Sequence, residues 1–343
     1  MSLTSNRIFF KNFVSSVVKD SPLPGLSGGE IIVISINLTG TRLVNSRTDK
    51  SLRVWKCTPD NLVDPVIIEH PHEKAVESVS WEPKSEFTFA TAGKDDKIKI
   101  WRTTGTLEKE IKVTKHDDKG GDVPVQCKFV DYSNDGAILS VVDRDSMVFL
   151  YNVAENYALA GRIQLDAPIY DLQWFNSAHD FFICALHNGT LPVYQVLPSE
   201  ALNQNPQKSS LVSITHKHAL IGHRSSANCV AIDPRGAYFA VGSNEGVVSI
   251  WSTLSMICTR VITNTDEPIS KIAISRDGAY LAAAYDHNSN IKIFDYDTTD
   301  QVFEVPNSLS GKLTFPTICW FPSKTCFVYT SDSGRTMNLM RKP

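Results

Sequence analysis

Short stretches in which apolar and polar residues alternate recur along the whole chain. Three of the clearest end in tryptophan, at Trp55, Trp101 and Trp251. A period of two places successive side chains on opposite faces of a β-strand. Weaker copies end at other large residues, namely Tyr151, Tyr194, Phe294 and Met340. The pattern predicts a protein assembled from repeated sets of strands.

The spacing of these end positions defines the repeated unit. Successive ends are separated by 46, 50, 43, 57, 43 and 46 residues. Units of this length that consist of short alternating strands are typical of β-propellers, in which each blade has four strands. The strand pattern excludes coiled coils, helical solenoids and leucine-rich repeats. We therefore expect an all-β, seven-bladed propeller.

Acidic and amide residues occupy a fixed place within most units. Six positions before the terminal aromatic residue stand Asp49, Asp95, Asp145, Asn188, Glu245 and Asn288. Asp and Asn in a tight turn can accept hydrogen bonds from nearby backbone N–H groups. His72 and His223 precede two of these turns, and each is expected to bond a turn residue or a Ser/Thr hydroxyl of its own blade. We interpret all of these residues as structural.

The last unit lacks an outer strand. Its three expected strands cover residues 315–320, 326–330 and 335–340. An unpaired edge would leave backbone N–H and C=O groups exposed and the ring open. Residues 7–14 are strand-like and have no other unit to join, so we expect them to pair antiparallel with residues 335–340. The predicted organisation is a closing strand and connector at 1–29 and a propeller at 30–343, forming one structural domain overall.

Two segments interrupt the repeats. Residues 198–208 are polar and rich in Pro and Asn, which predicts a loop between the last two strands of blade four. Residues 116–122 contain two consecutive glycines and predict a second mobile loop.

Composition and charge narrow the class of protein. The 343 residues carry a formal net charge of −3, whereas a stand-alone nucleic-acid-binding domain is usually strongly basic. The seven cysteines include no C-x-x-C pair, which favours buried thiols in a reducing compartment. Because no run of about 18 apolar residues occurs, we expect no membrane span.

Candidate catalytic and metal-binding motifs are weak. Residues 25–29 match G-x-S-x-G but lack the preceding strand and following helix of a nucleophile elbow. His70 with His72, and His216 with His218, supply two ligands each, whereas zinc needs three or four. The sequence therefore predicts no catalytic residue, no cofactor and no metal site.

The repeats identify the chain as resembling a WD40 propeller over essentially its full length. The second half is also similar to the WD-repeat subunit of the THO complex, part of the TREX assembly. That similarity is carried by residues 220–223, 226–230, 233–243, 268–278 and 317–322. The resemblance implies a non-enzymatic scaffold subunit of a nuclear complex that couples transcription elongation to mRNA packaging and export. Implied partners are other THO/TREX subunits, including large helical scaffold proteins and a DEAD-box helicase, with RNA contacted at most indirectly and no membrane.

Loops next to the His and Asp positions should open on one face of the propeller. Charged and amide side chains in short loops are suited to recognition. We predict partner contacts at Arg224, Asn264, Asp266, Glu267 and His287.

Three other functions stay open. One is a scaffold of another nuclear or chromatin-associated complex. Another is a ubiquitin-ligase substrate receptor, although such receptors resemble a W-D-x-R pattern, and here Trp101 and Trp251 are followed by Arg102 and Ser252. The third is a propeller hydrolase, which would need acids or histidines that converge at the central channel.

Overall fold

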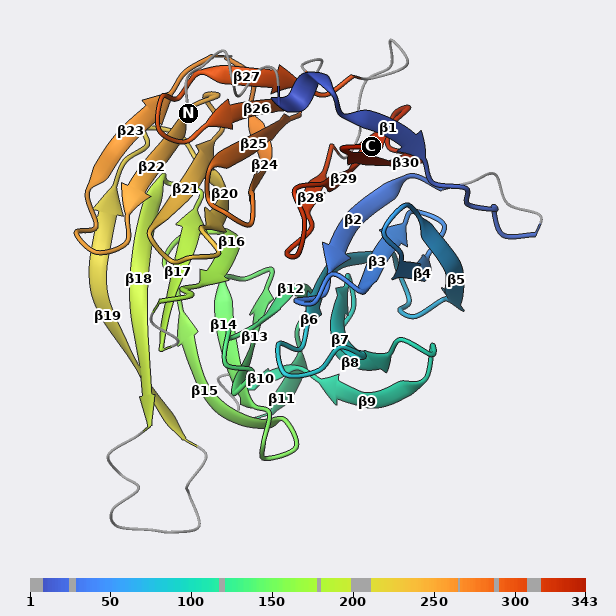
Figure 1. Cartoon of the computed structure of the whole chain (residues 1–343). Helices are drawn as coiled ribbons and strands as arrows, with labels where there is room; N and C mark the ends of the chain where they lie inside the picture. Colours follow the sequence, from blue (N-terminus) through green and yellow to red (C-terminus); the bar gives the residue numbers. More distant parts are fainter. Residues whose placement is uncertain are drawn as a thin grey trace.

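The computed structural model describes residues 9–24, 29–116, 121–177, 180–198, 211–264, 266–286, 290–306 and 316–343. Within these residues the strands form seven antiparallel four-stranded sheets and one two-stranded ribbon. The seven sheets surround a central axis as the blades of a propeller, with their first strands innermost (Figure 1). The predicted fold class is confirmed.

The first four blades follow one another in sequence order. Blade one contains β2 (Ile31–Ile36), β3 (Arg42–Arg47), β4 (Ser51–Cys57) and β5 (Leu62–Glu69). Blade two contains β6 (Val76–Trp81), β7 (Thr88–Gly93), β8 (Lys97–Arg102) and β9 (Leu107–Lys112). Blade three contains β12 (Cys127–Tyr132), β13 (Ile138–Asp143), β14 (Met147–Asn152) and β15 (Ala158–Gln164). Blade four contains β16 (Ile169–Trp174), β17 (Phe181–Leu186), β18 (Thr190–Pro198) and β19 (Val212–Ile221).

The last three blades complete the ring. Blade five contains β20 (Ala227–Ile232), β21 (Tyr238–Ser243), β22 (Val248–Ser252) and β23 (Cys258–Ile262). Blade six contains β24 (Ile269–Ile274), β25 (Tyr280–Tyr285), β26 (Lys292–Asp295) and β27 (Gln301–Glu304). Blade seven contains β28 (Ile318–Trp320), β29 (Phe327–Ser331), β30 (Thr336–Arg341) and the N-terminal β1 (Val14–Val17).

The hydrophobic core lies between neighbouring blades. One cluster joins Ala90 and Ile100 of blade two to Val130 and Leu139 of blade three, all of them buried. Four second strands are buried along their whole length, as in the Tyr280–Tyr285 segment, and the other three are buried after a half-buried first residue. Small side chains such as alanine let successive blades approach closely near the axis. Each blade therefore depends on its two neighbours for burial.

The N-terminus closes the ring, but in a different place from the one predicted. β1 pairs antiparallel with β30, from Val14 opposite Arg341 to Val17 opposite Asn338. Residues 9–11 form a helical turn, so the strand predicted at 7–14 is wrong over this part, and residues 7 and 8 lie outside the described residues. Phe10 is fully buried, with its ring 4.8 Å from that of Tyr280. The closely spaced phenylalanines therefore serve packing against blade six.

The connector after β1 is bound to blade one. Asp20 forms an ion pair with Arg47 at 2.5 Å and accepts a charged hydrogen bond from Arg53 Nε at 2.9 Å, and both arginines are buried. The backbone N–H of Ile31 donates to the carbonyl of Gly334 at 2.7 Å, which joins blade one to blade seven. Removing Asp20 would leave two buried positive charges without this partner, which is strongly unfavourable.

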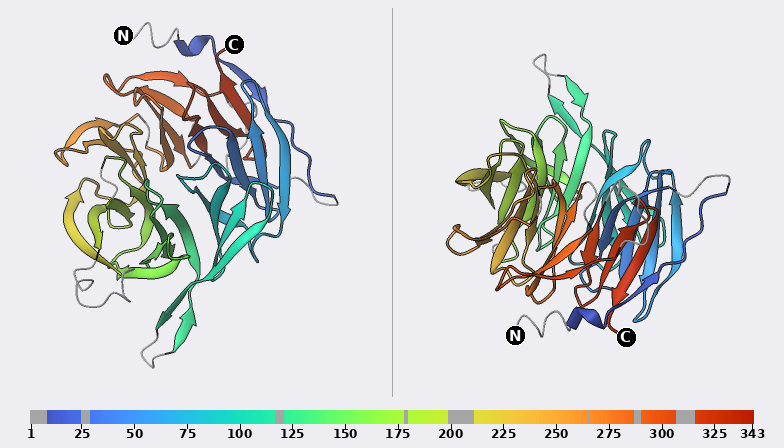
Figure 2. Two further views of the ribbon diagram at one scale, coloured as in Figure 1. Left: turned by 60° about the horizontal axis from the view of Figure 1, so that its bottom comes forward. Right: turned by 90° about the horizontal axis from the view of Figure 1, so that it is seen from above.

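Both predicted loops fall largely outside the described residues. Residues 199–210 are outside the described residues and, as predicted, connect β18 with β19 in blade four. The prediction of a loop at 116–122 is wrong in part. β10 (Thr114–His116) pairs with β11 (Asp122–Pro124), while residues 117–120 are outside the described residues. The resulting ribbon stands away from the blades (Figure 2).

Candidate functional site: blade loops and central channel

Antiparallel blades place their connections on two opposite faces. The loops between blades and the turns between second and third strands share one face, which we call the upper face; it includes residues 222–226 and 263–268. The turns after first and third strands share the other face, which we call the lower face; it includes residues 37–41 and 133–137. Both faces are rigidly positioned, because a closed ring fixes each blade from two sides.

Blade two contains a continuous buried hydrogen-bond network. His72 Nδ1 lies 2.9 Å from Asp95, and His72 Nε2 lies 2.8 Å from the Thr91 hydroxyl. Trp101 Nε1 donates to that hydroxyl at 3.0 Å. Burial alone would raise the pKa of Asp95, but hydrogen bonds from His72 and two backbone N–H groups, together with the charge of His72, hold it below its usual value. The network ties the upper-face loop to the third strand.

Blade five has a similar hydrogen-bond network, but the bond between the histidine and the turn acid is missing. His223 Nε2 lies 2.8 Å from the Ser249 hydroxyl, which accepts a hydrogen bond from Trp251 Nε1 at 2.7 Å. His223 Nδ1 has no hydrogen-bond partner among the described residues, since Glu245 Oε1 lies 3.9 Å away. Burial lowers the pKa of His223, and the charge of Glu245 only partly opposes this shift.

Blades one and three depart further from this plan. Trp55 donates to Asn45 at 2.7 Å, and Asp49 accepts the Ser51 backbone N–H at 3.0 Å. In blade three the predicted turn residue Asp145 is exposed and pairs with Lys115. The carboxylate that accepts the turn N–H groups is instead Asp143, which bonds Asp145 at 2.9 Å and Met147 at 2.8 Å. The role predicted for Asp145 therefore belongs to the residue two positions earlier.

Four of the five predicted partner-binding residues are described, and these four lie on the upper face. Arg224, Asn264 and Asp266 are exposed, and Glu267 is half-buried. His287 lies outside the described residues. The structure thus brings the loops of blades five and six to one face, and their contact with a partner stays a prediction.

A central channel passes between the blades. The first strands of all seven blades surround a volume of about 920 Å³. A β-bulge re-aims side chains at the position where it occurs. Six first strands show a register shift near their start, at Ile31/Val33, Val76/Ser78, Cys127/Phe129, Ile169/Asp171, Ala227/Cys229 and Ile269/Lys271. Consecutive residues such as Tyr170 and Asp171 consequently both line the channel.

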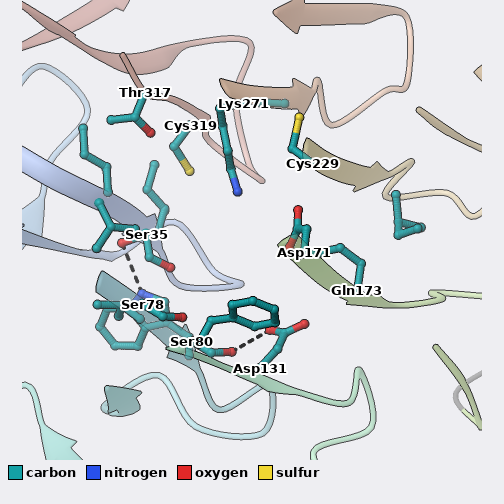
Figure 3. A pocket seen from close by; sticks show the side chains of 18 of the residues that line it. Ser35, Ser78, Ser80, Asp131, Asp171, Gln173, Cys229, Lys271, Thr317 and Cys319 are labelled. Atoms are coloured by element: carbon teal, nitrogen blue, oxygen red, sulfur yellow. Dashed lines mark hydrogen bonds between the residues drawn. The ribbon is translucent and has the colours of Figure 1, made fainter. Parts of the chain in front are cut away.

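Two opposite charges face each other in the middle of the channel. Asp171 of β16 and Lys271 of β24 both point inward (Figure 3). Asp171 is held by the backbone N–H groups of Leu172 and Val230, each at 2.9 Å, and by Gln173 at 3.2 Å. Burial would lower the pKa of Lys271, but the charge of Asp171 and weaker neighbours raise it overall. Lys271 is therefore a cation matched by Asp171.

Of the two channel acids, Asp131 is the one whose negative charge is less well balanced by its neighbours. It lies on β12 and accepts a hydrogen bond from Ser80 at 2.9 Å (Figure 3). Burial raises the pKa of Asp131 to about 7, Asp171 adds to the shift, and Ser80 and Lys271 oppose it. Near neutral pH this carboxylate is consequently poised to respond to a nearby positive charge.

Sequence reasoning missed these channel residues. They come from three blades and meet only because the ring closes. A usable signal was present, since Lys271 interrupts the otherwise apolar or small-residue strand Ile269–Ile274. A charge inside a first strand has the channel as its only solvated surroundings.

Metal binding, reactive thiols and membrane-spanning helices have little support in the described part of the chain. There, groups of three or more His, Cys, Asp or Glu side chains that could hold a metal ion do not occur. All seven cysteines are free thiols, and burial raises the pKa of Cys319 and of Cys326 to about 11. Among the described residues, helices long and apolar enough to cross a membrane are absent.

Comparisons with known proteins agree with this geometry. The family model "WD domain, G-beta repeat" matches residues 64–102, 214–252 and 256–295. Each match begins within or just before the outer strand of one blade and ends with the third strand of the next. The β-propeller domain of Cps50 (Swd1) from Myceliophteria thermophila superimposes with a TM-score of 0.72, covering 95% of this chain and 99% of that domain at 11% identity. The chain is thus a WD-repeat β-propeller.

Sequence relatives define the resemblance more narrowly. THO complex subunit 3 of Arabidopsis thaliana is 25% identical over 301 residues, covering 87% of this chain and 85% of that protein. The WD repeat-containing protein AAC3 of Dictyostelium discoideum is also 25% identical, but the match covers 71% of this chain and 51% of that protein. Protein TEX1 of Saccharomyces cerevisiae is 18% identical over 91% of this chain. The chain is a WD-repeat protein that resembles THO complex subunit 3.

Proposed function

We propose that the chain is a non-enzymatic scaffold subunit of a nuclear THO-like complex that couples transcription to mRNA packaging and export. The observation that carries the proposal is the nearly end-to-end match with THO complex subunit 3, which covers 87% of this chain and 85% of that protein. Equal coverage on both sides supports the same architecture, whereas the AAC3 match spans about half of that protein. The proposed partners are other subunits of such a complex, including large helical proteins and a DEAD-box helicase.

Scaffolding fits the physical character of the molecule. A closed ring holds its loops in fixed positions. Binding of a partner to these loops therefore costs the propeller little conformational entropy. The upper-face loops with Arg224, Asn264 and Asp266 are proposed to contact a partner subunit, because their side chains are exposed. The net charge of −3 argues against tight or sequence-selective RNA binding, so RNA is expected to be contacted at most indirectly.

The channel acids are the feature that a hydrolase would need, and we assign them to binding instead. Both carboxylate oxygens of Asp171 accept hydrogen bonds from backbone N–H groups, and Lys271 faces this residue. Such contacts hold an ionised carboxylate in place. Asp131 lies closer to the lower face, on the penultimate position of its strand. Hydrolytic turnover by the purified protein that Asp131→Asn abolishes would contradict the non-enzymatic assignment.

Affinity purification from cells followed by mass spectrometry tests the proposal. The tagged chain should recover THO-like subunits and localise to the nucleus. A triple variant, Arg224→Ala, Asn264→Ala and Asp266→Ala, should recover less of one subunit while retaining the wild-type melting temperature. The matched control is Asp300→Ala, an exposed acid at the lower-face turn of blade six, which should leave recovery unchanged. Recovery of a different nuclear complex or of a cullin ligase would refute the proposal in favour of that assembly.

A further inference from the structure

The penultimate residues of the seven first strands form a ring near the lower end of the channel, and all except Ala231 line it. These residues are Ser35, Ser80, Asp131, Gln173, Ala231, Ala273 and Cys319. Asp131 is the charged member of this ring, and the charges of Asp171 and Lys271 lie two positions earlier on their strands. The lower ring therefore has a negative charge that its own members do not balance.

Asp131 can be reached from the lower face. Its strand ends one residue later, at Tyr132, where the lower-face turn begins. The channel mouth on that side is formed by turn residues, namely Leu38, Pro83, Asn134, Asn176, Pro234 and Pro322. Two of these are fixed by contacts between blades, because Asn134 donates to the Trp174 carbonyl at 3.1 Å and Asn176 to the Asp233 carbonyl at 3.0 Å. The mouth is thus an opening held in place by contacts between blades, and its walls are apolar and amide side chains.

An apolar surface continues from this mouth over blades one and two. Leu38, Phe87 and Leu107 are 69%, 50% and 41% exposed, respectively. Their turns are connected, since Asn37 Nδ2 donates to the Glu86 carbonyl at 3.2 Å and Thr103 N to the Phe87 carbonyl at 2.8 Å. Leu38 belongs both to this surface and to the channel mouth. Exposed apolar side chains on a rigid surface beside a polar rim are typical of protein-binding sites.

Acidic side chains accompany the apolar surface. Glu82 and Glu86 occupy the lower-face turn of blade two, and Glu108 is the second residue of its outer strand. Burial raises the pKa of Glu82, and the charge of Glu108 adds to this shift. The nearby cation Arg102 is already paired with Glu108, which leaves Lys84 as the basic side chain of the same turn. This arrangement favours a partner that brings positive charge.

We propose that the lower face over blades one to three binds a partner segment whose Lys or Arg head group reaches Asp131 while neighbouring apolar side chains cover Leu38, Phe87 and Leu107. The inference rests on the proposed scaffold function and specifies the chemistry of one partner. An acidic or phosphorylated segment is disfavoured on this surface by Asp131, Glu82 and Glu86, whereas Glu108 is already paired with Arg102. A cationic head group that enters the channel regains in Asp131 the partner that it loses on leaving water.

Binding of synthetic peptides to the purified full-length chain tests the proposal. The probes are pools of short peptides with randomised flanks and a fixed central Arg, Lys, citrulline or Glu. Citrulline matches arginine in shape but has no charge. Wild-type protein should retain the Arg and Lys pools over the citrulline and Glu pools, with apolar residues enriched on the flanks. Equal retention of all pools, or preference for Glu, would overturn the proposal.

Two variants separate the parts of the surface. Asp131→Asn should reduce the preference for Arg and Lys over citrulline by at least about tenfold, because the carboxylate charge is lost. Phe87→Ser should abolish enrichment of apolar flanks while keeping the preference for a central cation. Ser35→Ala is the matched control, since it removes another hydroxyl of the same ring but leaves the carboxylate and the Ser80–Asp131 hydrogen bond in place. Unchanged selectivity in Asp131→Asn at the wild-type melting temperature would refute the site, whatever complex the chain is found to join.

Discussion

Blade two and blade five build the same upper-face support with different completeness. In blade two the chain of contacts runs from Asp95 through His72 and Thr91 to Trp101. In blade five it runs only from His223 through Ser249 to Trp251, because Glu245 lies too far from His223 to form a hydrogen bond. Both histidines and both tryptophans are nevertheless buried. The comparison indicates that burial fixes the blade, while the acid adds a local hydrogen-bond contribution.

The hydroxyl that links histidine to tryptophan comes from different strands in the two blades. Thr91 lies on the second strand of blade two, opposite Lys99. In blade five the equivalent second-strand residue is Val241, and its cross-strand neighbour Ser249 supplies the hydroxyl. Facing positions of an antiparallel pair lie close together, so either strand can provide the group. The blade therefore requires a hydroxyl at a point in space, and its place in the sequence can change.

The largest effect should be the same in the two blades. Trp101→Ala and Trp251→Ala should each lower the free energy of unfolding by about 3–5 kcal/mol, through lost burial and the cavity that remains. Each tryptophan is 6% exposed, so the costs should agree despite the different networks. Denaturant unfolding measures both, with Leu254→Ala as the control because Leu254 is 96% exposed. A much smaller loss for Trp251→Ala would show that blade five is loosely packed.

The next effect should separate the blades. Asp95→Ala removes the acceptor of His72 Nδ1 and of the Glu73 and Lys97 backbone N–H groups. Leaving such buried groups unpaired should cost about 3 kcal/mol. Glu245→Ala should change stability by less than about 0.5 kcal/mol, because Glu245 makes no close contact with His223.

Paired unfolding curves of these two variants measure the difference. Asp95→Asn serves as an intermediate, since its amide oxygen can still accept a hydrogen bond but carries no charge. Equal losses of unfolding free energy in Asp95→Ala and Glu245→Ala would contradict this difference. The view at stake is that, of the two blades, only blade two has a turn acid that stabilises the fold.

Much of the ring was predictable from sequence because it rests on local patterns. The alternation of apolar and polar residues predicted the strands. The spacing of the large residues that end them predicted seven units. The closing strand was misplaced because Phe9, Phe10 and Phe13 look like a strand pattern when only their spacing is considered. Their rings pack together on one side, with the Phe10 and Phe13 centroids 5.1 Å apart, which a helical turn allows.

The candidate site was less predictable, for a geometric reason. Asp131, Asp171 and Lys271 are far apart in sequence and meet across an axis that exists only after closure. Bulges at the start of the first strands add to the difficulty, because they break the strict alternation that would assign each side chain to a face. The exposed loops of the upper face, by contrast, follow directly from strand order.

A smaller, stabilising effect should appear when blade five is made more like blade two. Glu245→Asp places the shorter acid that blade two uses at this turn, where Asp95 lies 2.9 Å from His72 Nδ1. A new hydrogen bond to His223 Nδ1 should raise the free energy of unfolding by about 1 kcal/mol. The matched control is Asp95→Glu, which should destabilise blade two. A neutral result for Glu245→Asp, with a loss in Asp95→Glu, would show that the blade-five turn cannot bring an acid to the histidine.

The smallest effect should be a difference in pH dependence. Burial lowers the pKa of His223, so the folded chain resists the proton that the unfolded chain accepts below about pH 6.5. Its stabilising contribution is thus complete above that pH and is lost as pH falls from about 6.5 towards the folded pKa. Asp95 has a lowered pKa as well, so its contribution is present above about pH 4 and is lost only as pH falls through the folded value. Mild acid should therefore weaken blade five while leaving the Asp95 contribution of blade two intact.

Comparing unfolding free energies at pH 7.5 and 5.5 isolates this contribution. His223→Gln keeps a hydrogen-bond donor near Ser249 but cannot titrate, and subtracting its pH dependence from that of the wild type cancels the remaining histidines. The wild type should lose about 0.5 kcal/mol more than His223→Gln over this interval. Glu245→Asp should reduce or reverse the difference, because an acid bonded to His223 Nδ1 favours the protonated ring. Identical pH dependence in all three proteins would mean that His223 titrates alike in the folded and unfolded chain, and the contrast between the two blades would then lie only in hydrogen bonding.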